Sequence, residues 1–276
     1  QEKQIDRLAI TVMPGPQLSH AVPLCRDLKA KYPHLVIIWG GYFPTQHWDA
    51  CLDASYVDYV VRGHGEQAFV NLLDGLDNGL QTVDLEGLAY RRPGTTEIIS
   101  HDLPPVPQPE ALPDFPYHQI DMTRYIRPTF MGQRTLPHHS SYGCPFFCNF
   151  CAVVNMVGGK WQAQSAESTA RTTAYLVKTW NVDAVEFYDN NFFTQQSRVA
   201  EFSERIMPLH IHWWGEGRID TMLKFSDKTW QLMEKSGLKM AFLGAETGSD
   251  ATLKRMDKGG TATTEKTLEI AAKMKA

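Results

Sequence analysis

The chain has 276 residues, 43% of them hydrophobic, which is enough for one large domain or two of ordinary size. A net charge of only −4, with no lysine- and arginine-rich run, predicts no surface for nucleic acid or for an anionic membrane. No apolar run approaches the length of a membrane span, and the first residues do not form a signal peptide. Five cysteines without the spacing of a disulfide framework favour a reducing cytoplasm.

Residues 1–100 alternate between apolar runs of strand length and amphipathic helical patterns. This order predicts a parallel sheet covered by helices on both faces. A hairpin with Pro93 and Gly94 at its turn would follow. The expected strands are 6–13, 35–41 and 56–63, the helices 20–32, 45–55 and 65–76, and the hairpin 87–100.

A proline-rich segment follows the hairpin, with six prolines from Pro104 to Pro116. Such a composition is typical of an extended, semi-rigid linker. We therefore predict an α/β domain at 1–100, a linker at 101–118 and a second domain at 119–276.

The second domain repeats the strand-helix rhythm in four successive units. Parallel strands bring their carboxyl ends to one edge, where ligands bind in α/β folds. Polar or functional side chains follow each expected strand in this domain. The expected strands are 135–143, 182–191, 211–220 and 238–248, and the helices 167–180, 197–207, 227–237 and 263–275.

The segment GCPFFCNFC holds three of the five cysteines, namely Cys144, Cys148 and Cys151. Three thiolates on one loop suit an iron–sulfur cluster or zinc. A 4Fe–4S cluster held by three cysteines leaves one iron free for a substrate or cofactor. Zinc would need a fourth ligand, for which His138 and His139 are close in sequence. The cysteines alone leave both possibilities open.

The longer stretch SSYGCPFFCNFCA resembles the signature of the radical S-adenosylmethionine (radical SAM) enzymes, with Phe150 as the aromatic residue before the last cysteine. The resemblance implies a partial βα barrel with a 4Fe–4S cluster on Cys144, Cys148 and Cys151. It also implies reductive cleavage of S-adenosylmethionine (SAM) to a 5′-deoxyadenosyl radical. A small-molecule substrate and an electron donor such as flavodoxin or ferredoxin would be the partners, and Phe150 would lie against the adenine.

The stretch EFYDNNFF follows the second strand of this domain, where the family keeps a short motif near the SAM amino group. The resemblance therefore assigns Asp189, Asn190 and Asn191 to SAM. These residues would otherwise cap the helix expected near Ser197.

Two further stretches resemble the family in the expected order. WGEGRID follows the third strand, and Arg218 there would bind the SAM carboxylate through a bidentate fork, with Glu216 as its neighbour. FLGAETGSDATLKRMDKG follows the fourth strand, and Glu246 would approach the SAM ribose or methionine. The alternatives are an ordinary salt bridge for Arg218 and a surface loop for Glu246.

The first domain resembles the cobalamin-binding domain that precedes many radical SAM barrels. Thr11-Val12-Met13 stands for the family's S-x-L, and 26 residues separate it from the pair Gly40-Gly41. Thr11, Met13, Gly40 and Gly41 would therefore contact cobalamin. Glycine would let the nucleotide tail lie against the strand ends. A plain Rossmann-like module without a ligand, or a nucleotide-binding domain, remains the alternative.

The combined prediction is a partial flavodoxin-like (Rossmann-like) domain followed by an incomplete radical SAM barrel. The activity would be cobalamin-dependent methyl transfer, or a radical cyclisation, on an unactivated carbon. Methylthio transfer would need further cysteines in the first domain, which Cys25 and Cys51 do not supply. The alternative from another class is a non-catalytic module stabilised by zinc. We also expect the chain to continue beyond Gln1 and beyond Ala276.

Overall fold

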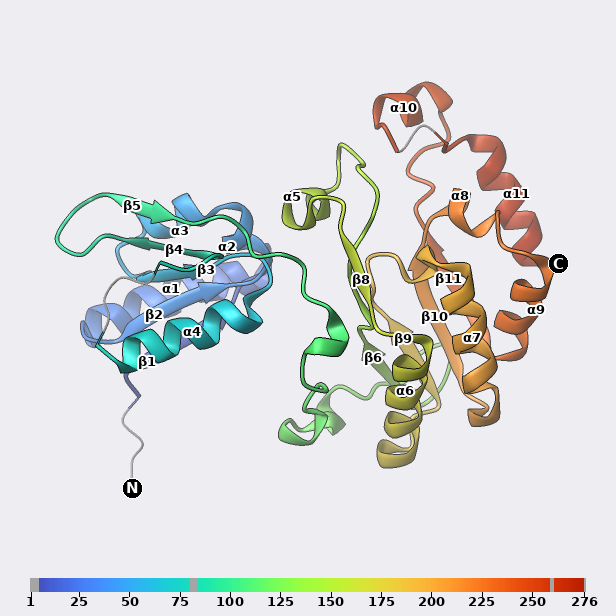
Figure 1. The fold of residues 1–276 in the computed structure, drawn as a ribbon, viewed down its shortest axis with the longest axis horizontal. Coiled ribbons are helices and arrows are strands. Elements are labelled where there is room, and N and C mark those ends of the chain that lie inside the picture. Colours follow the sequence, from blue (N-terminus) through green and yellow to red (C-terminus); the bar gives the residue numbers. More distant parts are fainter. Residues whose placement is uncertain (1–4, 80–83, 259–260, 276) are drawn as a thin grey trace. The chain divides into compact units, whose positions relative to one another are not determined.

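A computed structural model describes residues 5–79, 84–258 and 261–275. The chain divides into two compact units, 1–105 and 106–276 (Figure 1). The division lies inside the segment that we predicted as a linker. Part of that segment belongs to unit 2, because Pro109 is buried and the Glu110 carboxylate accepts a hydrogen bond from the Ser165 N–H at 2.8 Å.

Unit 1 is built on a five-stranded sheet in the order β1-β2-β3-β4-β5. The first three strands pair in parallel, and β4 and β5 add the expected hairpin at one edge. The elements are β1 (Arg7–Thr11), α1 (Pro16–Lys31), β2 (Val36–Gly40), α2 (Tyr42–Gln46), α3 (Trp48–Asp53), β3 (Tyr59–Val61), α4 (Gly65–Asp77), β4 (Leu88–Arg91) and β5 (Ile98–Ser100).

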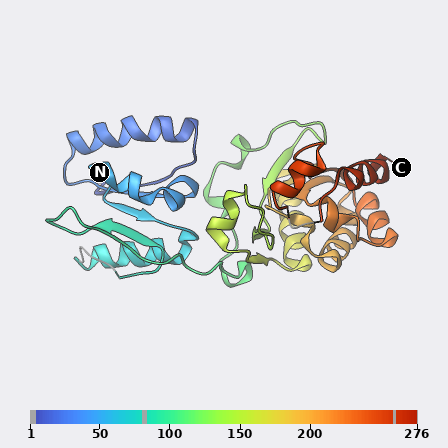
Figure 2. The same cartoon turned by 90° about the horizontal axis from the view of Figure 1, so that it is seen from above.

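The sheet of unit 1 is apolar on both faces, since successive side chains of a strand point to opposite sides. Ile37 and Trp39 pack with buried residues of α1 and α3, whereas Ile38 packs with buried residues of α4. Figure 2 shows α1, in blue, and α4, in cyan, on opposite sides of the sheet. This confirms the predicted parallel sheet with helices on both faces.

Unit 2 contains a parallel four-stranded sheet in the order β11-β10-β9-β6. Within this sheet, the strands lie side by side in the order in which they occur along the chain, as in a barrel wall. The strands and α-helices are β6 (Thr135–His138), β7 (Ser141–Gly143), α5 (Ala152–Val157), β8 (Trp161–Ala163), α6 (Ala166–Trp180), β9 (Ala184–Phe187), α7 (Gln196–Ile206), β10 (His212–Gly217), α8 (Ile219–Met222), α9 (Asp227–Lys235), β11 (Leu238–Leu243), α10 (Asp250–Arg255) and α11 (Thr264–Lys275). The 3₁₀ turns are η1 (Pro109–Ala111), η2 (Tyr117–Gln119), η3 (Met122–Arg124), η4 (Phe192–Thr194) and η5 (Met207–Leu209).

The core of unit 2 lies between this sheet and helices α6, α7 and α9. Phe187 of β9 and Trp213 of β10 point into it, where their rings meet edge to face at 6.1 Å. Ala184 and Trp214 alternate onto the other face of the sheet. Among the described residues, no helix is long and apolar enough to cross a membrane.

The expectation of one strand at 135–143 is wrong. The segment forms two strands, of which β6 pairs with β9 and β7 pairs in antiparallel fashion with β8 in a separate two-stranded sheet. At this change of sheet the buried Asp189 carboxylate accepts hydrogen bonds from Ser140 and Ser141, which hold the chain between the two strands. The cysteine loop therefore starts from this small hairpin and not from the main sheet.

Candidate functional site

The three cysteines of unit 2 lie on the loop that leads from β7 to α5. None forms a disulfide; Cys148 is buried, and Cys144 and Cys151 are half-buried. The Cys151 N–H donates to the Cys148 carbonyl at 3.0 Å, which folds the loop back on itself. Free, partly accessible thiols on a turned loop are suited to ligating a metal group.

Hydrogen-bond donors from two other strand ends point at the sulfurs. Asn191 Nδ2 donates to Cys144 Sγ at 3.9 Å, and Arg218 Nη1 donates to Cys148 Sγ at 3.3 Å. Burial raises the pKa of the Cys144 thiol, whereas the Phe146 N–H, Asn191 and Arg218 act in the opposite direction. The net pKa of Cys144 is raised, so the free residue is a thiol, but these donors are placed to stabilise the thiolate that a bound metal group would create.

Arg218 is held by several contacts beside the cysteine loop. It follows β10 directly, and only 6% of its surface is exposed. Its Nε and Nη2 hold the Asp220 carboxylate at 3.0 and 2.9 Å, and Nη2 also donates to the Lys258 carbonyl at 2.7 Å. Its guanidinium lies 3.9 Å from the centre of the Phe146 ring. The two donors of Arg218 that could form a bidentate fork to a SAM carboxylate, Nε and Nη2, are therefore directed at Asp220.

Asp220 and Lys258 were not singled out from the sequence. Burial alone would raise the pKa of Asp220, but hydrogen bonds from Arg218 and Thr261 lower it below its ordinary value. The sequence pattern that could have pointed to Asp220 is its position two residues after Arg218, in the stretch GRID. Lys258 lies 40 residues away from Arg218, and no local pattern joins the two.

Asp189 is fully buried beneath the start of the cysteine loop. Its carboxylate accepts hydrogen bonds from the Ser140 N–H and hydroxyl, both at 2.6 Å, and from the Ser141 hydroxyl at 2.8 Å. Arg198 donates to the same Ser140 hydroxyl at 2.6 Å. In this arrangement both carboxylate oxygens of Asp189 are bound to Ser140 and Ser141 and hold the loop, and its assignment to SAM stays a prediction.

The two asparagines that follow Asp189 differ. Asn190 is exposed, whereas Asn191 is 1% exposed and lies beside Cys144. The Asn191 Oδ1 has no hydrogen-bond partner within the described residues. A buried acceptor without a partner costs about 1–3 kcal/mol, so it is suited to receive a donor from a bound group.

Glu216 and Glu246 lie at the ends of neighbouring strands. Glu216 is half-buried on β10, where burial and the negative charge of Asp189 raise its pKa. Glu246 follows β11 with a positive φ of 61° and pairs with Lys258 Nζ at 2.5 Å. Phe150 is 47% exposed on the cysteine loop. Their roles toward SAM remain predictions.

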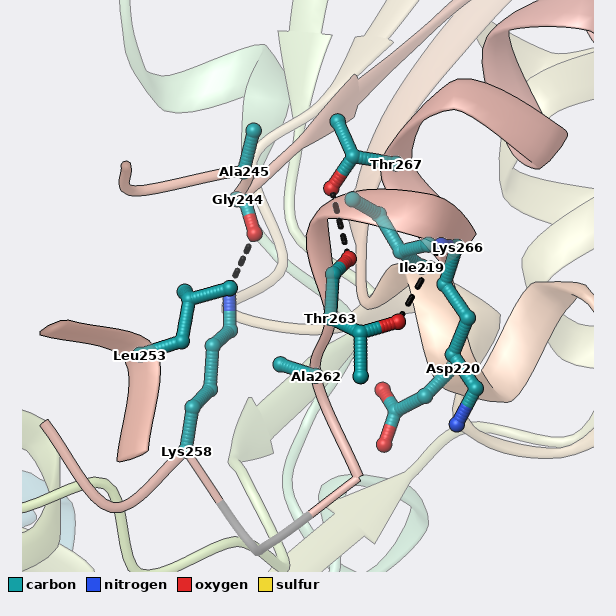
Figure 3. Close-up of a pocket in the computed structure, with 10 residues that line it drawn as sticks. All are labelled: Ile219, Asp220, Gly244, Ala245, Leu253, Lys258, Ala262, Thr263, Lys266 and Thr267. Carbon is teal, nitrogen blue, oxygen red and sulfur yellow. Dashed lines mark hydrogen bonds between the residues drawn. The ribbon is translucent and has the colours of Figure 1, made fainter. Parts of the chain in front are cut away.

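A small cavity lies beyond these strand ends, between the turn after β10 and the start of α11 (Figure 3). The Lys258 side chain reaches across it to the Gly244 carbonyl, and Asp220 borders it. Its volume of about 10 Å³ has room for roughly one water molecule. This cavity is therefore too small for an organic cofactor.

No group of three or more His, Cys, Asp or Glu side chains that could hold one metal ion occurs in the part of the chain that the structure describes. A zinc site needs four ligands that converge on a single ion. His138 is also engaged elsewhere, since its Nδ1 lies 2.7 Å from the Tyr117 hydroxyl. The structure thus gives no support to a zinc site. A cluster needs no such convergence, because each cysteine binds a different iron.

The strand ends of unit 1 surround a larger cavity of about 400 Å³. Thr11, Gly40 and Gly41 line it, as predicted for a ligand pocket, whereas Met13 is not among its lining residues and is 43% exposed. Gly41 has a φ of +92°, and a Cβ there would lie 2.7 Å from the Thr11 methyl group. Gly63 and Gly65, from the stretch RGHG, complete a wall with few side chains.

Residues 1–73 match the B12 binding domain family. Anaerobic magnesium-protoporphyrin IX monomethyl ester cyclase of Synechocystis sp. is 28% identical over 87% of this chain and 47% of its own length. The chain thus spans about half the length of that relative.

Two solved structures share the fold. The cobalamin-dependent SAM radical enzyme OxsB, with aqua-cobalamin and SAM bound, has a TM-score of 0.71 at 19% identity, covering 95% of this chain and 38% of that one. The radical SAM methyltransferase TsrM of Kitasatospora setae, with cobalamin and a [4Fe-4S] cluster bound, has a TM-score of 0.72 at 15% identity. This match covers 96% of this chain and 55% of that one. These likenesses confirm the predicted fold class in both units.

Proposed function

We propose that the chain is a radical SAM enzyme with an N-terminal cobalamin-binding domain and that it functions with a 4Fe–4S cluster, SAM and cobalamin; the matched B12 binding domain and the similar proteins support this. Cys144, Cys148 and Cys151 would hold the cluster, and one iron would remain for SAM. The observation that carries this proposal is the pair of donors, from Asn191 and Arg218, directed at two of the three sulfurs. Donors to ligand sulfurs are a regular feature of iron–sulfur sites.

When bound, the reduced cluster and SAM supply a 5′-deoxyadenosyl radical, and cobalamin supplies a carrier for a methyl group. The residues of the chain would bind, orient and shield these groups. Asn191 offers its unpaired Oδ1 beside Cys144, Glu216 offers a carboxylate, and Phe150 an exposed ring. In unit 1, Thr11, Gly40 and Gly41 would leave space for cobalamin.

The reaction that we propose takes place on an unactivated carbon of a small molecule. Methyl transfer and radical cyclisation are its two forms, and similar proteins include a cyclase and a methyltransferase. A fold shared by both reactions does not choose between them. SAM with a deuterated methyl group distinguishes them once a substrate is found, because only methyl transfer carries the label into the product. A low-potential electron carrier such as flavodoxin or ferredoxin would reduce the cluster in the cytoplasm.

The first test is anaerobic reconstitution with iron and sulfide, followed by iron analysis and an absorbance spectrum. We expect a brown protein with about four irons per chain. Cys148→Ala should lose this cluster, whereas Cys51→Ala, which removes a buried thiol from unit 1, should keep it. A colourless wild-type protein that holds one zinc would overturn the proposal in favour of a zinc-stabilised module.

A further inference from the structure

We propose that Arg218 is a positioning residue that raises the reduction potential of the cluster through its hydrogen bond to Cys148. This inference rests on the proposed function, because it requires the cluster on Cys144, Cys148 and Cys151. The step concerned is the addition of one electron by an external reductant, which takes the cluster from its 2+ to its 1+ state. Arg218 makes and breaks no covalent bond in it.

The geometry leaves Arg218 little freedom. The carboxylate of Asp220 and the carbonyl of Lys258 fix one edge of the guanidinium, and the Phe146 ring covers its face. Nη1 then points at Cys148 Sγ at 3.3 Å. Thr261 donates to Asp220 in turn, which keeps the acidic partner in place.

The count of donors argues against the SAM carboxylate as the main partner of this arginine. A guanidinium has five N–H groups. Four of them are directed at Asp220, Lys258 and Cys148 in the described part of the chain. The remaining one cannot form a bidentate fork, so binding a carboxylate that way would break the pair with Asp220.

The electrostatic consequence has a definite sign. Reduction adds a negative charge to the cluster, and both a hydrogen bond to a ligand sulfur and a nearby cation stabilise that charge. Only 6% of the surface of Arg218 is exposed, so water screens its charge weakly. Asp220 offsets part of its charge from the side away from Cys148. Removal of Arg218 should therefore lower the potential, and neutralisation of Asp220 should raise it.

The test uses the reconstituted chain without SAM and measures the midpoint potential by EPR-monitored reductive titration. Arg218→Met should shift the reduction equilibrium roughly tenfold toward the oxidised cluster. For a one-electron couple this lowers the midpoint potential by about 59 mV. Asp220→Asn should shift it in the opposite direction. Opposite shifts exclude a merely structural role, because loosening of the loop would not change sign between the two variants.

Arg218→Met leaves the buried Asp220 without its partner and would be destabilised. The double variant Arg218→Met with Asp220→Asn removes both charges and should still have a lower potential than Asp220→Asn alone. Arg205→Gln, on the exposed side of α7, is the control for the loss of one positive charge and should leave the potential unchanged.

The outcomes separate the two proposals. A wild-type chain that takes up no cluster overturns the proposed function and this inference together. Clusters of equal potential in the wild type, Arg218→Met and the double variant overturn the inference alone. A tenfold weaker SAM affinity in Arg218→Met at unchanged potential would also overturn it, and would return Arg218 to the SAM carboxylate.

Discussion

The strand ends of the two units are built in opposite ways. In unit 2 they carry buried charged groups, Asp189, Arg218 and Asp220, each held by several hydrogen bonds. In unit 1 they carry glycines around a cavity of about 400 Å³, where Glu66 is the one charged residue among those that line it. One site is organised by fixed charges and the other by missing side chains. The first should therefore be sensitive to the loss of a charge, and the second to the gain of a methyl group.

The largest effect is expected where a buried charge is removed from unit 2. Asp189→Ala leaves three donors from Ser140 and Ser141 without an acceptor and leaves Arg198 without a nearby anion. We expect a loss of about 3–5 kcal/mol in the unfolding free energy of unit 2. Hydrogen exchange resolved by peptide would locate the loss in β6, β7 and β9.

Asp114→Ala is the control, because it removes an exposed carboxylate that pairs with Arg171 at 3.6 Å. An exposed pair of this kind contributes at most about 1 kcal/mol. Equal losses in the two variants would mean that the hydrogen bonds to Asp189 stabilise unit 2 no more than an exposed ion pair does.

A pH effect should also be confined to unit 2. His138 is buried, and burial lowers its pKa to about 4 from the ordinary value of 6.5. The unfolded chain takes up the proton first as the pH falls, so stability is lost between pH 6.5 and 4, by about 3 kcal/mol in total. Thermal unfolding of the chain at pH 7, 5.5 and 4.5 measures this loss, and hydrogen exchange at the same pH values locates it in unit 2.

His138→Asn should flatten that pH dependence, although it also removes the bond to Tyr117 and lowers stability at every pH. His139→Asn, at the exposed neighbouring position, should keep the slope of the parent. A slope that persists in His138→Asn would assign the effect to other groups.

The smaller effect in unit 1 comes from adding one methyl group. Gly41→Ala forces an alanine into a backbone conformation with φ +92° and ψ −161°, and its Cβ would meet the Thr11 methyl at 2.7 Å. We expect unit 1 to lose about 2 kcal/mol. Gly40→Ala meets only ordinary contacts with Val61, at 3.5 Å or more, and should cost less than about 1 kcal/mol. If both variants unfold at the same temperature, the conformation of Gly41 does not matter.

The same contrast explains what the sequence could predict. Most of the longer strands and helices of both units followed from strongly periodic apolar patterns, because both faces of a parallel sheet must be buried. The glycines of unit 1 could be placed in the cavity for the same reason: Gly40 and Gly41 end a strand, and strand ends of a parallel sheet share one edge.

The charged site of unit 2 could be predicted only in part. The cysteines and Arg218 were found from spacing and resemblance, but some of their hydrogen-bond partners lie 40 or more residues away, as Lys258 does from Arg218 and Asn191 from Cys144. The break between β6 and β7 was missed, and the residue that binds Ser140 there, Asp189, lies 49 residues downstream. Long-range contacts of this kind leave no local pattern.

The smallest effect expected concerns Glu216, a half-buried carboxylate at the end of β10. Its folded pKa is raised by burial and by Asp189, so its charged form is less favourable in the folded than in the unfolded chain. Stability contributed by this group therefore falls as the pH rises through its ordinary value toward the raised one. Glu216→Gln should raise the melting temperature of unit 2 slightly at pH 7 and give no gain below pH 4. If the proposed role toward SAM is right, the same variant should bind SAM more weakly. A variant that is both less stable at pH 7 and unchanged in SAM affinity would contradict the view that this carboxylate is kept for a ligand at the expense of stability.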